Sequence, residues 1–210
     1  MALPDGWTPN IEGVDEERTM DFTLRIFTEK EARELLQSED FLSSWSQLAQ
    51  KDKKVTVMQE PTFALTWYEQ YSTKYTPVLC VGFDKDENPI ALMPLAKNIE
   101  DGSIVHAGAH QAEYHGWVAE SQIVQDFPIK CLIQIKRTFK LKVRPWRWLP
   151  PKAPIDWLSS PLLKTENIYV RYKTQASPVW DLGDNDKFDK LTRIKSIRNN
   201  INRYQRVGDF

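Results

Sequence analysis

All three histidines of this 210-residue chain lie in one short segment, VHAGAHQAEYHGW, at residues 105–117. His106, His110 and His115 are accompanied there by Glu113. Imidazole and carboxylate groups bind transition metals, and they also move protons in general acid–base catalysis. A third interpretation is a polar loop that is only solvated. Which of the three is favoured depends on the spacing of these residues and on the secondary structure expected around them.

A metal site is the least favoured of the three. Two histidines four residues apart bind one ion when they share a helix face. His106 and His110 have this spacing, but Gly108 lies between them and a strand pattern precedes them, so no helix is expected there. On an extended strand, residues four apart lie too far apart to chelate one ion. Neither cysteine is nearby in the sequence, and we predict no metal ligand in this chain.

Motifs of nucleophilic and nucleotide chemistry are absent from the sequence. There is no G-x-S-x-G stretch, and both cysteines lie in apolar runs that do not favour a thiolate. The chain has only eight glycines, and none forms a G-x-x-x-x-G-K-[ST] or a strand-linked G-x-G-x-x-G phosphate loop. General acid–base chemistry is open to His110, Glu113 and His115 if their loop lines a cleft. No catalytic residue is assigned.

A β-rich block is expected to position the histidine segment. The runs TPVLCVGFD and PIALMPLAK are rich in hydrophobic residues, and the polar sequence DKDEN between them predicts a hairpin turn. Asp101-Gly102 predicts a second tight turn, followed by a third antiparallel strand. The histidine segment would therefore begin at the end of that third strand.

Helical patterns precede and follow this block. Thr28 and Glu31 have the spacing of a capping box, which predicts a helix that begins at Glu29. Apolar residues three and four apart predict a second helix over 40–50, and Pro61 favours the start of a third helix with an aromatic face. The stretch VTVMQ between these two helices is expected to be a short strand. Residues 121–140 are predicted to be helical, with Pro128 as a candidate for the true start.

Composition indicates a protein with a sizeable core and no membrane span. The apolar fraction is 41%, and no apolar run is long enough to cross a bilayer. The first residues lack the basic and apolar regions of a secretory signal. Cys80 and Cys131 each lie in an apolar run and are expected to be free thiols, with a disulfide as the alternative. We expect a cytoplasmic protein.

Charge is distributed unevenly along the chain. Residues 1–100 contain 10 Lys and Arg against 18 Asp and Glu, whereas residues 101–210 contain 18 against 11. A basic half favours anionic ligands such as phosphates, nucleotides or nucleic acid. The alternative is that the acidic and basic halves face each other within one fold.

The last stretch, 185–210, is predicted to form a helix with an apolar stripe and a basic face. Arg198, Arg203 and Arg206 on the basic face could contact phosphates or a partner domain, although a solvated face is the alternative. A helix that closes on Gly208 just before the chain stops suggests a fragment. The apolar stripe would then pack on the chain's own sheet or mediate self-association.

Three stretches together resemble one known family. Residues 55–97 contain the aromatic helix pattern, a strand, a turn and an ALMPL strand. Residues 108–118, GAHQAEYHGWV, contain Gly, an acidic residue followed by Tyr, and Gly; residues 193–210 are a basic helix pattern ending in Gly. In order and spacing these stretches resemble the GNAT-fold N-acyltransferases of the cellulose-biosynthesis-associated type. Members usually have Asp where Glu113 stands here.

The resemblance implies the architecture. It implies an α/β fold in which a mixed, mostly antiparallel sheet is flanked by helices. Members have two tandem GNAT-like domains, as the Fem-type peptidyl transferases do. Residues 22–184 would be the first domain, preceded by a flexible leader over 1–21 and followed by a linking helix over 185–210 to a C-terminal GNAT domain.

The resemblance also implies a function, which is acyl transfer to an amine. The first domain would help to form a cleft for a small-molecule or peptide amine, and the second would carry acyl-CoA. Residues 1–210 contain no R/Q-x-x-G-x-G/A pyrophosphate loop, so the chain alone is expected to be inactive and to hold no cofactor, with acyl-CoA as co-substrate of the parent protein. The residues of the histidine segment expected to bind substrate are His110, Glu113, Tyr114, His115 and Trp117.

A second function class is a non-catalytic module that binds nucleic acid. Residues 136–148, KRTFKLKVRPWRW, interleave basic and aromatic side chains, which is typical of surfaces that bind single strands. The alternative for this stretch is a helix followed by a strand whose aromatic side chains face the core. The acyltransferase interpretation is preferred.

Overall fold

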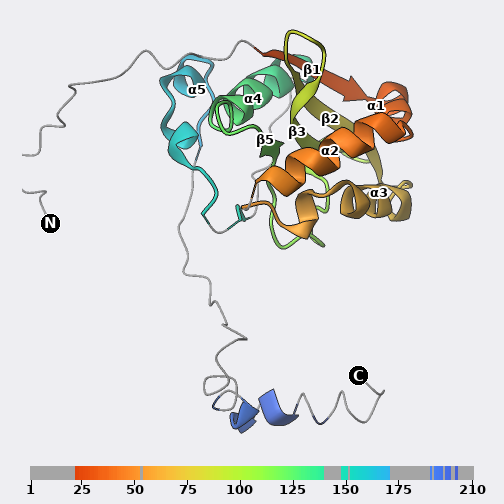
Figure 1. Cartoon of the computed structure of the whole chain (residues 1–210), viewed down its shortest axis with the longest axis vertical. Helices are drawn as coiled ribbons and strands as arrows, with labels where there is room; N and C mark the ends of the chain where they lie inside the picture. Colours follow the sequence, from red (N-terminus) through yellow and green to blue (C-terminus); the bar gives the residue numbers. More distant parts are fainter. Residues whose placement is uncertain are drawn as a thin grey trace, which may run out of the picture. The chain divides into compact units, whose positions relative to one another are not determined.

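The computed structural model describes two compact units, Met1–Val170 and Arg171–Phe210, each of which is treated by itself (Figure 1). The described residues are 22–52, 54–139, 148–150, 152–170, 190, 192–195, 197–199 and 202. The leader predicted over 1–21 and the predicted domain boundary after residue 184 therefore lie outside the described residues.

An open antiparallel sheet of five strands forms the centre of the first unit. The strand order is β1-β2-β3-β4, and β5 pairs with β3 as well. The elements in chain order are β1 (Thr23–Thr28), α1 (Glu29–Leu35), α2 (Glu39–Lys51), the 3₁₀ helix η1 (Val57–Gln59), α3 (Pro61–Gln70), β2 (Tyr75–Phe83), β3 (Pro89–Asn98), β4 (Ile104–His106), β5 (Val118–Ala119), α4 (Asp126–Phe139), the 3₁₀ helix η2 (Asp156–Ser159) and α5 (Pro161–Thr165). The α/β class predicted from the sequence is confirmed. Every strand pair among the described residues is antiparallel, so a parallel pair of a mixed sheet is not among them.

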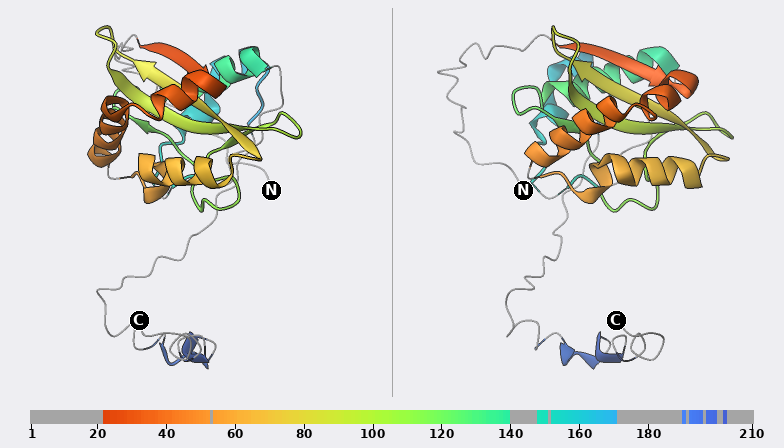
Figure 2. Two further views of the ribbon diagram at one scale, coloured as in Figure 1. Left: turned by 90° about the vertical axis from the view of Figure 1, so that its right-hand side faces the viewer. Right: turned by 45° about the vertical axis from the view of Figure 1, so that its right-hand side comes forward.

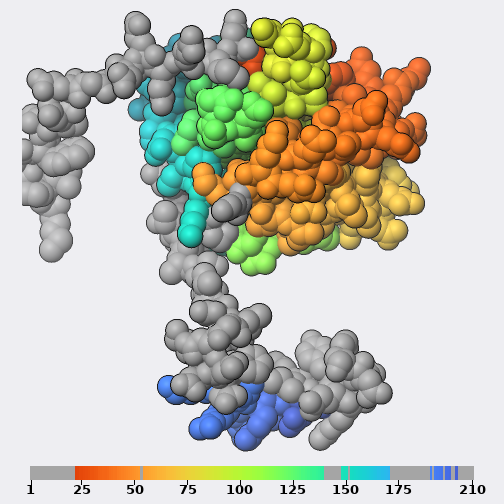
Figure 3. Space-filling model, viewed as in Figure 1, coloured from red at the N-terminus to blue at the C-terminus, as the bar shows by residue number. Residues whose placement is uncertain are grey.

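Both faces of the sheet are buried by helices, which explains why β2 and β3 are apolar almost throughout. Val78 and Cys80 of β2 belong to one core, together with the buried side of α4. Leu79 and Val81, which point the opposite way, belong to a second core with α1, α2 and α3. Figure 2 shows the helices on the two sides of the sheet, and Figure 3 shows α2 and α3 covering it on one side.

The predicted hairpin and the third strand are confirmed. β2 and β3 pair antiparallel along their length, and the turn between them is held by Asp84, whose carboxylate accepts hydrogen bonds from the amides of Asp86 and Asn88. After the turn at Gly102, β4 pairs with β3 from Ile104 onward. The sequence did not predict β5, because two residues show no periodicity.

The strand predicted at 55–59 is wrong. Residues 57–59 form η1, because Thr56 and Gln59 make a capping box. The Thr56 hydroxyl accepts from the amide of Met58 at 3.3 Å, and the Gln59 side chain accepts from the Thr56 amide at 3.0 Å. These local bonds satisfy backbone groups that a strand would have to pair with a neighbouring strand.

The helices begin close to where the sequence indicates. α1 begins at Glu29, but the expected capping box is absent: the Thr28 side chain makes no cap hydrogen bond, since Thr28 still belongs to β1 and pairs with Val78. α4 begins at Asp126, so Pro128 lies in its first turn, where a missing amide proton costs nothing.

Cys80 and Cys131 are free and buried, as predicted, on β2 and α4 respectively. Burial raises the pKa of the Cys131 thiol well above its ordinary value, and the neighbouring Cys80 raises it further. Both side chains therefore serve as small apolar groups where the sheet meets α4. Among the described residues, no helix has the length and apolar character needed to cross a bilayer.

The second unit is described at a few residues of the predicted terminal helix. Ile197, Arg198 and Asn199 are helical, and the amide of Arg198 donates to the carbonyl of Ile194 at 2.9 Å. Arg198 is exposed, whereas Arg203 and Arg206 lie outside the described residues. Contact of these arginines with phosphates or a partner stays a prediction.

The core between the sheet and α4 depends on Phe127. Its side chain is fully buried and packs against Phe22, with Gly82 of β2 close by. Phe127→Ala is expected to lower the free energy of unfolding by about 3–5 kcal/mol, because a cavity remains where the ring was. Leu162→Ala, on an exposed side chain of α5, is the matched control and should change stability little. Chemical denaturation measures both, and equal losses would contradict this assignment of the core.

Candidate functional site

The histidine segment is a loop anchored at both ends on one strand. β4 ends with His106 opposite Leu95 of β3, and β5 begins with Val118 opposite Leu92 of the same strand. The amide of Ala107 donates to the carbonyl of Pro94 at 3.0 Å, so pairing continues just past β4. Residues 107–117, here called the histidine loop, therefore leave the sheet and return to it within a few residues along β3.

The first part of the histidine loop is a tight turn around Gly108. The amide of Ala112 donates to the carbonyl of Gly108 at 3.0 Å, and Gly108 has φ of +94°. A Cβ atom at this position would lie 2.4 Å from the Cβ of Ala112 and 3.0 Å from the ring of Phe63 on α3. Both the backbone conformation and the contact with α3 therefore require glycine here.

The ring of His115, in the histidine loop, stacks on the ring of His106 at the end of β4. Their centroids are 4.8 Å apart, the angle between the planes is 8°, and both side chains are buried. The Nε2 atom of His115 lies 2.9 Å from the carbonyl oxygen of Ala109. The amide of His115 donates to the carbonyl of Trp148 at 2.7 Å, which ties the loop to the segment before Pro150.

The surroundings of His106 favour the uncharged form of its ring. Its Nδ1 atom lies 2.8 Å from the carbonyl oxygen of Ala107, and its Nε2 atom lies 3.0 Å from the amide nitrogen of Gly116. The Nε2 atom also lies 2.5 Å from the carbonyl oxygen of Gly116, so either ring nitrogen of the neutral form has a backbone carbonyl to which it can donate. Burial lowers the pKa of His106 below its ordinary value of 6.5, and the carbonyls of Ala107 and Gly116 offset part of this shift.

Gln59 connects the histidine loop to α2 through hydrogen bonds. Its side chain is fully buried, and its amide group donates to the carbonyl of Tyr114 at 3.0 Å. Its own backbone carbonyl accepts from the indole of Trp45 on α2 at 2.8 Å. One residue of η1 thus joins α2, η1 and the loop. Gln59 was not among the residues predicted from the sequence; its capping-box spacing from Thr56 was the available signal.

The five residues predicted to bind substrate are divided by the fold. His110 and Glu113 are exposed, and Tyr114 is half-buried. His115 lies in the buried ring pair, and Trp117 packs edge-on against Trp157 while its indole donates to the carbonyl of Val124 at 3.0 Å. The exposed residues and the buried ones do not share one surface, and substrate binding by them stays a prediction.

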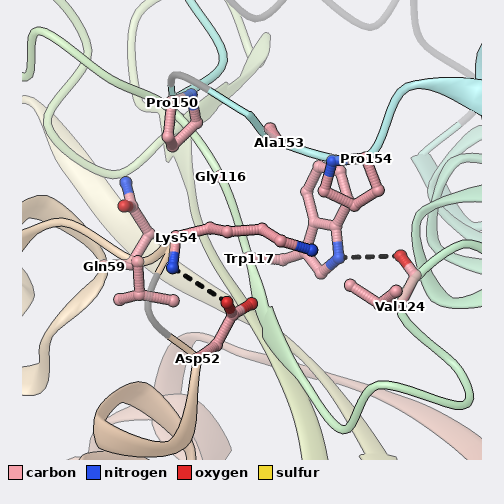
Figure 4. A pocket seen from close by; sticks show the side chains of 10 residues that line it. Asp52, Lys54, Gln59, Gly116, Trp117, Val124, Pro150, Ala153 and Pro154 are labelled. Atoms are coloured by element: carbon pink, nitrogen blue, oxygen red, sulfur yellow. Dashed lines mark hydrogen bonds between the residues drawn. The ribbon is translucent and has the colours of Figure 1, made fainter.

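Next to the end of the histidine loop lies a groove made of two adjoining hollows, here called the α2 groove. The first hollow encloses about 290 Å³, part of it open to solvent, and its wall includes Gly116 and Trp117 (Figure 4). The second, of about 820 Å³ including open solvent, is lined by the end of α2 and by residues 119–122. The two hollows share Asp52, Lys54 and Val124. Trp117, one of the five residues predicted to bind substrate, thus lines a concave surface.

No group of three or more His, Cys, Asp or Glu side chains within the described part of the chain is arranged to hold a metal ion. Two basic side chains of the stretch 136–148, those of Lys136 and Arg137, contact residues that follow α5. Lys136 donates to the carbonyl of Asn167 at 3.2 Å, and Arg137 pairs with Glu166. Residues 140–147 of that stretch lie outside the described residues. These contacts do not test nucleic-acid binding, which stays an alternative prediction.

Comparison with known proteins returns no relative. No protein family, no curated protein and no solved structure matches this chain.

Two glycines with positive φ form a matched pair: Gly108 in the histidine loop and Gly102 in the turn between β3 and β4. Gly108→Ala is expected to lower the free energy of unfolding by about 2–5 kcal/mol, because the methyl group adds a clash to an unfavourable backbone conformation. Gly102→Ala, at φ of +69° with no atom within 4 Å of the added methyl, should cost only about 1–2 kcal/mol. Thermal or urea unfolding compares the two variants. Equal losses would show that the contact with Phe63 and Ala112 is not tight.

The burial of neutral His106 predicts a pH-dependent stability. Because its folded pKa lies below 6.5, the unfolded chain binds more protons as the pH falls through 6.5. The stabilisation is complete above that pH and is lost toward the folded pKa, with a slope of at most about 1.4 kcal/mol per pH unit. Unfolding in urea between pH 7.5 and pH 5 measures it. His106→Gln should flatten the curve, and equal slopes in wild type and His106→Gln would refute the assignment.

Proposed function

We propose that this chain is the first, acceptor-side domain of a GNAT-type N-acyltransferase, which moves an acyl group from acyl-CoA to an amine. The observation that carries the proposal is that α3 is hydrogen-bonded both to the ALMPL strand and to the histidine loop, which are the parts of residues 55–118 that resemble the family. Tyr68 donates its hydroxyl hydrogen to the carbonyl of Leu95, in the ALMPL strand, at 2.7 Å. Trp67 donates its indole N–H to the side chain of Gln111, in the histidine loop, at 3.2 Å. The aromatic helix, the strand and the loop thus form one packed unit.

The proposal assigns acceptor binding to this domain and acyl-CoA binding to a second one. Residues 1–210 contain no pyrophosphate loop of the R/Q-x-x-G-x-G/A type. Arg198, Arg203 and Arg206 on the terminal basic segment would contact the phosphates of the donor or the second domain. The acceptor would lie between the two domains, over the surface that presents the histidine loop.

The proposed reaction needs a proton acceptor. The amine nitrogen attacks the thioester carbonyl, a C–N bond forms, the C–S bond breaks, and the proton lost by the amine is balanced by protonation of the departing thiolate. Glu113 and His110 are exposed on the histidine loop and have the chemistry to accept that proton on its way to solvent. Buried His106 is a structural residue in this scheme rather than a base.

The test is an acyl-transfer assay on the full-length protein that contains this chain. Acetyl-CoA and a panel of primary amines and amino acids are supplied, and CoA thiol release is followed with mass detection of the amide. We expect transfer by the protein that carries both domains and none by residues 1–210 alone. Glu113→Gln should lower kcat/KM for the acceptor by about tenfold or more, as removal of a general base does.

Glu100→Gln is the matched control, since Glu100 is an exposed carboxylate in the turn between β3 and β4 and lies outside the histidine loop. Absence of acyl transfer with every donor and acceptor, together with a sequence beyond residue 210 that lacks an acyl-CoA loop, would overturn the proposal. Salt-dependent binding of single-stranded nucleic acid by residues 1–210 would favour the alternative module.

A further inference from the structure

The α2 groove carries charges of both signs. The lining of its second hollow includes Lys51, Asp52, Lys54 and Glu120. None of these four residues takes part in an ion pair among the described residues. The Asp52 carboxylate accepts one hydrogen bond from the amide of Lys54 at 2.9 Å, and a carboxylate has room for several more.

One end of the groove suits a cation. α2 ends at Lys51, so the negative end of its dipole lies beside Asp52. Figure 4 shows the carboxylate of Asp52 bordering the first hollow. A carboxylate and a helix C-terminus both stabilise an ammonium group.

The lysines suit an anion in the same space. In Figure 4 the Lys54 side chain extends along the hollow toward Trp117, so its ammonium is within reach of a bound carboxylate. Beside these charges the lining of the second hollow includes the apolar side chains of Leu48, Ala119 and Val124.

We propose that the α2 groove binds a free α-amino acid, with its ammonium at Asp52 and its carboxylate at Lys54. The second hollow, whose lining includes Leu48, Ala119 and Val124, takes an aliphatic side chain. That this ligand is the acyl acceptor rests on the proposed function; the binding itself does not. Its amine, once deprotonated, is a nucleophile of the kind that acyl transfer requires.

The test is an NMR titration of the ¹⁵N-labelled 210-residue chain with L-leucine, L-leucinamide and N-acetyl-L-leucine. L-leucinamide lacks the carboxylate, and N-acetyl-L-leucine lacks the ammonium. We expect L-leucine to shift the amides of Gly116 and Ala119 and each masked compound to bind about tenfold or more weakly. These amides report the groove because Gly116 lines one hollow and Ala119 the other.

Variants that each remove one charge test which side chains bind the ammonium and the carboxylate of the ligand. Asp52→Asn and Lys54→Gln should each weaken L-leucine binding by about tenfold. The matched controls are Asp86→Asn and Lys85→Gln, which remove the same charges from exposed side chains in the turn between β2 and β3. The controls should bind L-leucine as the unmodified chain does, and ¹H–¹⁵N spectra verify that all four variants are folded.

The outcomes separate this inference from the proposed function. No binding of L-leucine, or equal binding of a masked compound, or unchanged binding by Asp52→Asn and Lys54→Gln, would overturn the zwitterion site. Acyl transfer by the full-length protein only to amines that do not bind this groove would overturn the identification of the groove ligand as the acceptor, and would leave the binding site and the proposed function standing. Groove binding without any acyl transfer would support the site and overturn the function.

Discussion

The buried side chain of Gln59 connects the layers on which the candidate site depends. Its amide holds the carbonyl of Tyr114, its carbonyl oxygen accepts from Thr56, and its backbone carbonyl accepts from Trp45. A polar side chain without partners in this position would cost free energy, and no buried side-chain nitrogen or oxygen among the described residues lacks a partner. Gln59 therefore sets the position of the histidine loop relative to α2, and with it the shape of the α2 groove.

The same arrangement separates polar groups by role. His106 and His115 are enclosed, stacked and bonded to backbone carbonyls, so they shape the loop and are not offered to a ligand. The exposed side chains of the loop and the charged side chains at the end of α2 are available for chemistry. A loop whose interior is rigid can present such groups with little loss of conformational freedom on binding.

Much of the fold follows from local patterns. The hairpin of β2 and β3 was predictable because two apolar runs flank a polar turn, and α2 and α3 were predictable from their buried aromatic faces. The error at η1 arose because a capping box between Thr56 and Gln59 outweighs a short β-branched run. β5 was missed because its strand character comes from pairing with β3 and not from its own two residues.

For the candidate site, composition and spacing specify a polar loop at a strand end, with glycine where the backbone must turn tightly at Gly108. They do not specify which imidazoles are enclosed, since burial depends on contacts from residues far along the chain. Trp148, Gln59 and Phe63 all reach the loop from other segments. The α2 groove likewise brings the end of α2 near Trp117, Pro150 and Pro154, which are distant in sequence. Local preference thus determines the elements, whereas long-range packing and hydrogen bonding place the chemical groups beside one another.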